Sequence, residues 1–186
     1  MGISRAKRIS RGTAAGLLVL LLTSIGCATS GPEPGQRARA LPMAPQSSEQ
    51  YQCGPSTLAS VLAFHGKDVP EEIIAQAIYS PTAQGVLLHD MAWFAREQGF
   101  QADVRTGAVH DLKQAVDERL PPIVLLDYGI AHVRKPHFTA ITGVTDGGVF
   151  QLDDKRADDY VRMNLFTRLW ARAGNQYLVI TPAASP

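Results

Sequence analysis

The chain has 186 residues and a mass of 20.1 kDa, with 45% hydrophobic and 19% charged residues, which is typical of one globular domain. Its 18 basic and 17 acidic residues nearly balance, so the sequence predicts no basic surface for nucleic acid. Two cysteines are too few for a disulfide-dense scaffold or for a zinc site of four thiolates.

The N-terminus has the pattern of an export signal. An apolar run that begins at Ala14 and includes residues 17–22 follows four basic residues, which are Arg5, Lys7, Arg8 and Arg11. The run is shorter than the ~20 apolar residues that a spanning helix needs, which favours a secretory signal over a permanent transmembrane anchor. We therefore expect residues 1–26 to be a signal peptide that takes the protein out of the cytoplasm.

Small residues lead from this run into a cysteine, Gly26-Cys27. The arrangement resembles a bacterial lipoprotein signal, in which the cysteine is acylated and becomes the new N-terminus. The resemblance implies a lipid anchor on Cys27 and, because Ala28 is not aspartate, a position at the outer membrane facing the periplasm. Ordinary cleavage after Ala28 and an uncleaved segment are the alternatives.

Residues 27–45 contain four prolines and no apolar periodicity, so we expect a lipid-anchored tether rather than folded structure. The folded domain is then predicted to span residues 46–182, with residues 183–186 as a tail.

Helices are predicted ahead of the sheet, at residues 54–64, 70–80, 88–98 and 111–119. Pro55 suits the first turn of the first helix, and Gly66 ends it. Strand-like segments follow at Ile123–Tyr128, Phe138–Val144 and Val149–Leu152, then a helix at Leu165–Arg172 and a last strand at Gln176–Thr181. Helices gathered ahead of antiparallel strands predict an α+β fold.

Two connections between these elements are also predicted. Asp146-Gly147-Gly148 is typical of a hairpin turn. The acidic stretch from Asp153 to Asp159 is interpreted as a solvated turn, because it lacks the glycine and the spacing that a calcium loop requires.

The chemistry-bearing residues begin with Cys53, which stands directly before the helix start Gly54-Pro55. The unpaired N–H groups and the dipole of a helix N-terminus stabilise a thiolate, and the same N–H groups can receive an oxyanion. If Cys27 is acylated, Cys53 is the one free thiol. A buried structural cysteine and a Cys27–Cys53 disulfide are the alternatives.

A cysteine nucleophile needs a base, and the chain has five histidines. His65 lies about three turns along the helix from Cys53, too far to touch it, and His89 and His110 lie near helix starts. From the residues alone His137 and His132 both remain candidates, with His137 favoured because it stands at the head of a strand. Their spacing does not fit a zinc site.

The third group of such a site orients the imidazole by accepting its other N–H. Asp153 ends the strand that follows the hairpin turn, and it is therefore expected across the hairpin from His137. Asp154 is one residue further and would face the other way in a continuing strand.

Three segments in this order, Gln52-Cys53-Gly54-Pro55-Ser56-Thr57-Leu58-Ala59, then residues 136–143, then Leu152-Asp153, resemble the bacteriocin-processing (double-glycine) cysteine peptidase family. The resemblance covers residues 45–181 and implies a papain-like fold without metal or cofactor. It implies Cys53 as nucleophile, His137 as general base and acid, and Asp153 as orienting carboxylate, with Asp154 as the alternative.

The resemblance also implies a glutamine before the cysteine whose amide donates to the oxyanion. Gln46 is closest to the family pattern and Gln50 is the second choice, whereas Gln52 is adjacent to the nucleophile. The expected reaction is hydrolysis of a peptide bond through a thioester.

The chain resembles stand-alone, exported members of the family, and it has no nucleotide-binding motif. The expected partners are a peptide or protein substrate and a membrane, to which the lipid anchor attaches the chain. Two other functions remain open. One is a cell-wall peptide amidase of the NlpC type, and the other is a non-catalytic lipoprotein that binds peptides.

Overall fold

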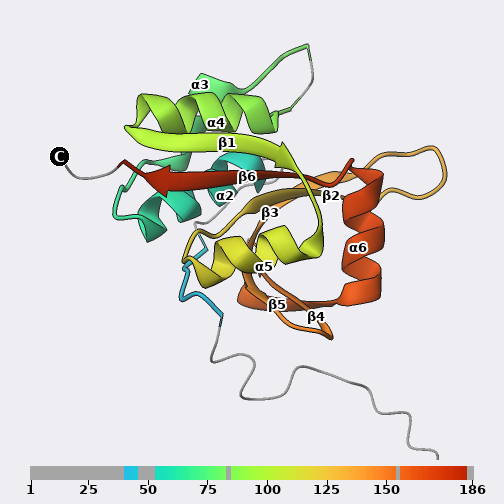
Figure 1. The fold of residues 1–186 in the computed structure, drawn as a ribbon. Helices are drawn as coiled ribbons and strands as arrows, with labels where there is room; N and C mark the ends of the chain where they lie inside the picture. The colour runs from blue at the N-terminus through green and yellow to red at the C-terminus, as the bar shows by residue number, and fades with distance from the viewer. Residues whose placement is uncertain (1–39, 46–52, 83–84, 154–155, 184–186) are drawn as a thin grey trace, which may run out of the picture.

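The computed structural model describes residues 40–45, 53–82, 85–153 and 156–183. Helices and strands follow one another along the described chain (Figure 1) in the order α2 (Cys53–Phe64), α3 (Glu71–Ile78), α4 (Leu88–Glu97), β1 (Phe100–Thr106), α5 (Val109–Asp117), β2 (Ile123–Asp127), β3 (Pro136–Val144), β4 (Gly148–Asp153), β5 (Arg156–Arg162), α6 (Met163–Arg172) and β6 (Gln176–Pro182). Every helix and strand that the sequence predicts is present, with ends within two residues of those expected.

The ends of the helices follow from local chemistry. Pro55 lies in the first turn of α2, where its missing N–H costs nothing. Gly66 just beyond α2 and Gly99 just beyond α4 have φ values of +84° and +92°, a conformation that glycine adopts without strain. Glu71 and Glu72 stand in the first turn of α3, where acidic side chains offset the helix dipole.

The strands form a six-stranded sheet in the order β1-β6-β2-β3-β4-β5, and each neighbouring pair is antiparallel. The C-terminal strand β6 therefore lies inside the sheet, between β1 and β2. The turn at residues 145–148 connects β3 and β4 as predicted, with the Thr145 N–H donating to the Gly148 carbonyl over 2.8 Å. The predicted α+β class is confirmed.

Two strands were not predicted, and each of them corrects an expectation. β1 lies between α4 and α5, so the helices do not all precede the sheet. β5 occupies most of the acidic stretch that was interpreted as a solvated turn. β5 packs just beyond this stretch, because Val161 is buried opposite Val149 and the centroid of the Tyr160 ring lies 5.1 Å from that of Phe150.

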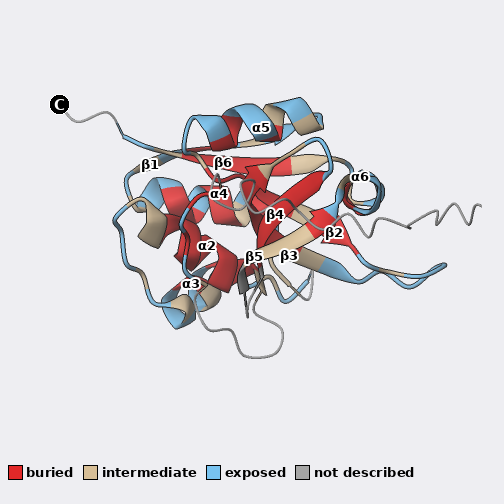
Figure 2. Cartoon of the chain, turned by 90° about the horizontal axis from the view of Figure 1, so that it is seen from below, coloured by how far each residue is buried: buried red, intermediate tan, exposed pale blue. Residues whose placement is uncertain are grey.

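The helices cover both faces of the sheet. α5 and α6 lie on one face, and α2, α3 and α4 lie on the other (Figures 1 and 2). Figure 2 shows that buried residues gather where the helices meet the strands. The largest fully buried side chains come from both layers and include Trp170, Phe150, Phe166, Leu58, Leu62, Met91, Leu126 and Ile141. The core therefore holds α2 and β3 in a fixed relation.

The described end of the predicted tether, residues 40–45, packs onto the domain. Leu41 and Met43 are buried in the core, and the Leu41 N–H donates to the Thr142 carbonyl over 2.8 Å. A register shift between Ile141 and Gly143 interrupts the β3–β4 ladder at this carbonyl. The packed structure therefore extends at least to residue 40, on the N-terminal side of the boundary predicted at residue 46.

No helix in the described ranges is long and apolar enough to span a bilayer. The predicted signal peptide and Cys27 lie outside the described residues.

Candidate active site

Cys53 is the first residue of α2 and is partly buried. The glycine that follows it lets this end of the helix approach its neighbours closely. A Cβ at Gly54 would lie 2.7 Å from Met91 Cε and 3.3 Å from both Phe138 Cδ2 and Val86 Cβ. Residues 54–62 are all buried, so the helix that carries Cys53 is held along most of its length.

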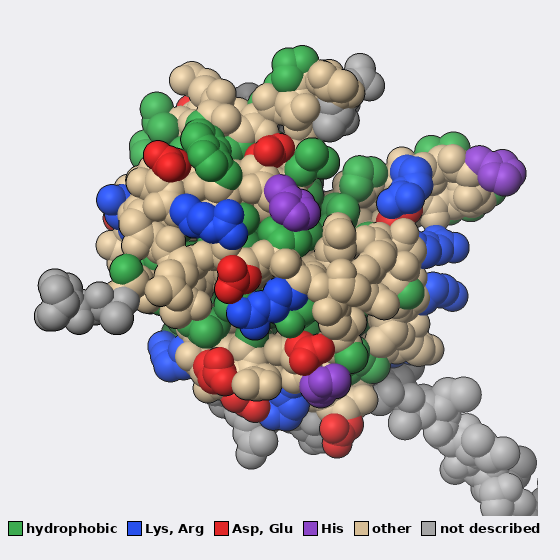
Figure 3. Space-filling model, turned by 45° about the horizontal axis from the view of Figure 1, so that its top comes forward, with side chains coloured by type: hydrophobic (Ala, Val, Ile, Leu, Met, Phe, Trp, Pro, Cys, Tyr) green, Lys and Arg blue, Asp and Glu red, His purple; other side chains and the backbone are tan. Residues whose placement is uncertain are grey.

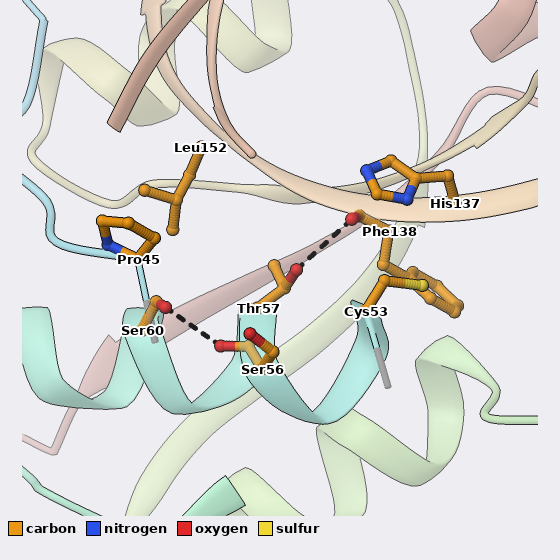
Figure 4. Close-up of a pocket in the computed structure, with 8 residues that line it drawn as sticks. All are labelled: Pro45, Cys53, Ser56, Thr57, Ser60, His137, Phe138 and Leu152. Carbon is orange, nitrogen blue, oxygen red and sulfur yellow. Dashed lines mark hydrogen bonds between the residues drawn. The ribbon is translucent and has the colours of Figure 1, made fainter. Parts of the chain in front are cut away.

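A side-chain hydrogen bond joins α2 to β3 beside Cys53. Thr57 is buried, and its Oγ1 donates to the Phe138 carbonyl over 3.3 Å (Figure 4). Ser60 Oγ donates to the Ser56 carbonyl of the same helix over 3.0 Å. Because Phe138 directly follows His137, the Thr57 bond holds the start of β3 against the first turns of α2.

His137 is the second residue of β3 and pairs with Leu126 of β2. Its imidazole is partly buried, and the Tyr128 ring lies against it edge to face, with 6.0 Å between the ring centroids. This contact packs the aromatic ring of Tyr128 against the imidazole at the start of β3.

Cys53 and His137 line the same small, open hollow. Pro45, Thr57, Phe138 and Leu152 also line it, together with the two serines Ser56 and Ser60 (Figure 4). The structure thus brings together, from α2 and β3, two residues that are 84 positions apart (137 − 53). A thiol and an imidazole that share a hollow have the composition of a nucleophile–base pair.

The other histidines lie elsewhere, and all five histidines are within the described ranges. His89, His110 and His132 are exposed, and His110 Nε2 lies 3.2 Å from Asp111 Oδ1. His65 follows the far end of α2, where its ring packs against Phe64 and Phe100. His137 is the histidine that lines the hollow.

The remaining predicted site residues are described in part or not at all. Asp153 is the last residue of β4 and directly follows Leu152, which pairs with Ala140 of β3. Asp154 lies outside the described residues, as do both predicted oxyanion donors, Gln46 and Gln50.

Next to the site lies a buried carboxylate that was not predicted from the sequence. Asp127 ends β2 and is only 5% exposed. The N–H groups of Lys135 and Gly129 donate to it, and together with the charges of Arg134 and Arg172 they hold the pKa of its carboxyl below the ordinary value despite desolvation. The carboxylate is therefore ionised at neutral pH.

Comparison with known proteins identifies the family. A model described as "Peptidase C39 family" matches residues 42–185. The chain belongs to the Peptidase C39 family. The start of the match lies within the packed segment 40–45. No curated protein matches the chain.

Solved C39 peptidase structures share the fold. A double glycine motif protease from an AMS/PCAT transporter, crystallised with the leader peptide, is similar with a TM-score of 0.62 and 21% identity, covering 77% of this chain and 94% of that one. A putative C39-like peptidase from Bacillus anthracis is similar with a TM-score of 0.65 and 16% identity, covering 79% of this chain and 97% of that one. The peptidase domain of Streptococcus ComA is similar with a TM-score of 0.58 and 21% identity, covering 76% of this chain and 98% of that one.

These findings confirm three predictions made from the sequence: the double-glycine peptidase family, the papain-like α+β fold and the enzyme class, a cysteine-type peptidase. The roles of individual residues in this C39 peptidase remain predictions.

Proposed function

We propose that this C39 peptidase is an exported, lipid-anchored enzyme that cleaves a peptide bond with Cys53 as nucleophile and His137 as general base. The observation that carries the proposal is that these two side chains line one hollow, from α2 and β3. The position of Cys53 at a helix N-terminus supports it, because the unpaired N–H groups and the dipole there stabilise a thiolate.

In the proposed reaction His137 accepts the proton of the Cys53 thiol, and the thiolate attacks the carbonyl carbon of the scissile peptide bond. The backbone N–H of Cys53 and the side-chain amide of Gln46, or of Gln50, donate to the oxyanion that forms. His137 then gives its proton to the departing amine, which leaves a thioester. Water hydrolyses the thioester, releasing the acid product and restoring the thiol.

Asp153 is proposed to accept the second N–H of the His137 imidazole and so to fix its tautomer. The position of Asp153 at the end of β4, directly after the residue that pairs with Ala140 of the strand that carries His137, supports this assignment. A peptide substrate is supported by the solved relative that was crystallised with a leader peptide.

The location at the cell envelope is part of the proposal. Acylation of Cys27 would fix the chain to a membrane, and the 13 residues from Ala28 to Ala40 span at most about 45 Å when extended. The hollow would then act on peptides close to the membrane surface. Labelling of growing cells with an alkyne-bearing fatty acid tests this part, because wild-type protein should take up the label and Cys27→Ser should not.

Alkylation of the full chain by iodoacetamide tests the chemical part. Digestion and mass spectrometry would read Cys53 separately from Cys27, at pH values from about 4 to about 9. We expect Cys53 to react quickly below pH ~7 and to lose this reactivity in His137→Ala. His132→Ala is the matched control, because His132 lies on the exposed loop before β3 and should leave the rate unchanged.

A thiol that reacts only near pH ~8.5, as a free cysteine does, and that is indifferent to His137→Ala would contradict the proposal. A fast thiol justifies a substrate search with a peptide library. Cleavage of cell-wall peptides instead of linear peptides in that search would identify an amidase of the NlpC type, and binding without cleavage would identify a peptide-binding lipoprotein.

A further inference from the structure

The connection between β2 and β3, residues 128–135, is an ordered hairpin that projects from the body of the molecule, at the right in Figures 1 and 3. The Tyr128 N–H donates to the Lys135 carbonyl over 3.0 Å, which extends the β2–β3 ladder by one step. At the tip, the Val133 N–H donates to the Ile130 carbonyl over 3.1 Å. The hairpin ends where β3 begins, one residue before His137.

One carboxylate closes the base of this hairpin. Asp127 Oδ1 accepts hydrogen bonds from the Gly129 N–H and the Lys135 N–H, each over 2.9 Å. Its other oxygen, Oδ2, pairs with Arg134 Nε over 2.8 Å. A single buried side chain thus binds both arms of the hairpin, and the charge makes each of these hydrogen bonds stronger than a neutral one.

The hairpin is also fixed to the rest of the domain. Arg172 of α6 donates to the Gly129 carbonyl over 2.8 Å. The two arms approach each other so closely that a Cβ at Gly129 would lie 1.9 Å from the Val133 carbonyl oxygen, which no other residue type can accommodate. This geometry depends on the arms being held together, and Asp127 is the side chain that bonds to both.

Two contacts lead from Asp127 to the imidazole of His137. In the β2–β3 ladder Asp127 pairs with Pro136, which directly precedes His137. On its other side Asp127 is followed by Tyr128, whose ring lies edge to face against the His137 ring. Opening the base of the hairpin would therefore release both the backbone before His137 and the aromatic ring beside it.

We propose that Asp127 is a positioning residue that holds the His137 imidazole in reach of Cys53 by closing the hairpin at residues 128–135. This role is distinct from that of Asp153, and it rests on the proposed function. Displacement of a catalytic group by about 1 Å is enough to slow an enzyme by about 10²-fold. A side chain that fixes the imidazole therefore affects the reaction rate even though it touches no substrate.

The test compares Asp127→Asn and Asp127→Ala with wild type in the full chain, using iodoacetamide as the probe and reading Cys53 by mass spectrometry. Asparagine keeps an oxygen that accepts hydrogen bonds but loses the charge that pairs with Arg134. Alanine loses both. Asp103→Ala is the matched control, because Asp103 is an exposed carboxylate on the edge strand β1 that pairs with Arg105 over 3.1 Å.

We expect Asp127→Ala to lower the alkylation rate of Cys53 between pH ~6 and ~7 by about tenfold or more, Asp127→Asn to lower it less, and Asp103→Ala to leave it unchanged. The titration of the His137 ring, followed by NMR and assigned through its loss in His137→Ala, should also shift in the Asp127 variants. All alkylation rates are compared at a temperature well below the unfolding transition of each variant. A merely structural loss would lower the melting temperature and move neither the pH profile nor the titration.

The outcomes separate the two proposals. A fast thiol in wild type that is lost in His137→Ala but kept in both Asp127 variants overturns the positioning role alone. A wild-type thiol indifferent to His137→Ala overturns the proposed function itself. If Asp127→Ala does not fold, Asp127→Asn and Arg134→Gln decide the matter, because each removes the ion pair and leaves groups able to accept the two backbone N–H bonds.

Discussion

The two ends of helix α2 each carry a reactive side chain, and their surroundings differ. Cys53 begins the helix and lines an open hollow together with His137. His65 follows the last residue, and its ring is enclosed by the rings of Phe64 and Phe100, with centroids 5.3 and 6.0 Å away. Its Nε2 atom is buried and has no hydrogen-bond partner among the described residues.

This contrast shows that the surroundings of a side chain, more than its chemical type, decide whether it can act. Burial lowers the pKa of His65, against the opposing effect of a hydrogen bond with the Ile180 backbone. The imidazole is therefore neutral at neutral pH, and it lies outside the hollow that Cys53 and His137 line. At the opposite end Cys53 lines a hollow together with a second imidazole, that of His137, and there the same helix presents the nucleophile that we propose.

The largest effect is expected from removing the thiol. Cys53→Ala should lower peptide hydrolysis by about 10⁴-fold or more, because the covalent intermediate can no longer form. The melting temperature should change little, since Cys53 is the partly buried first residue of its helix. Mass spectrometry of a peptide library, with thermal unfolding alongside, measures both. Residual hydrolysis close to the wild-type rate would rule out Cys53 as the nucleophile.

Much of this contrast was predictable from local sequence. Cys53 before Gly54-Pro55 predicts a thiol at a helix start, because proline and glycine act within one turn. The aromatic and β-branched residues of β3 predict a strand headed by His137. Both inferences depend on a few neighbouring residues, which explains why the helix and strand limits agree so well.

Features that depend on distant partners were not predictable in this way. Leu41 stands among prolines without periodicity, and its burial depends on the Thr142 carbonyl at the register shift in β3. β1 becomes a strand by pairing with the C-terminal strand β6. Asp127 before Tyr128-Gly129 is typical of an ordinary turn, and its bonds to Lys135 and Arg134 form only when the hairpin closes.

The segment at residues 40–45 belongs to the Cys53 end of the comparison, because Pro45 lines the hollow. Leu41 is 7% exposed, so Leu41→Ala should lower the free energy of unfolding of the full chain by about 2–4 kcal/mol. Urea denaturation measures this change. Leu87→Ala is the matched control, because Leu87 is 49% exposed and should change stability by no more than about 0.5 kcal/mol. Equal effects of the two substitutions would mean that residues 40–45 form a tether after all.

A smaller effect is expected at the hydrogen bond that joins α2 to β3, the elements that carry Cys53 and His137. Thr57→Val keeps the shape of the side chain but removes the Oγ1 donor to the Phe138 carbonyl, which should cost about 1 kcal/mol in the free energy of unfolding. It should also slow the alkylation of Cys53 several-fold, because β3 is no longer held against α2. Thr167→Val is the matched control, since the Thr167 hydroxyl bonds to the Met163 carbonyl within helix α6 and Thr167 does not line the hollow. A rate that falls equally in both variants would argue against a specific link between α2 and β3.

The smallest effect is expected at the His65 end of α2, and it concerns only the pH dependence of stability. Since burial lowers the pKa of His65 in the folded state, the folded chain favours the neutral ring more than the unfolded chain does, whose imidazole titrates near pH ~6.5. The contribution of His65 to stability is therefore complete above that pH and is lost as the pH falls through it towards the lower, folded pKa. His65→Leu should remove this acid-dependent loss in urea denaturation at pH 5 to 8, while the fast alkylation of Cys53 persists. A pH dependence of stability unchanged by His65→Leu would show that the imidazole at this end of α2 is as free to ionise as one in water, and the contrast between the two ends would then rest on the hollow alone.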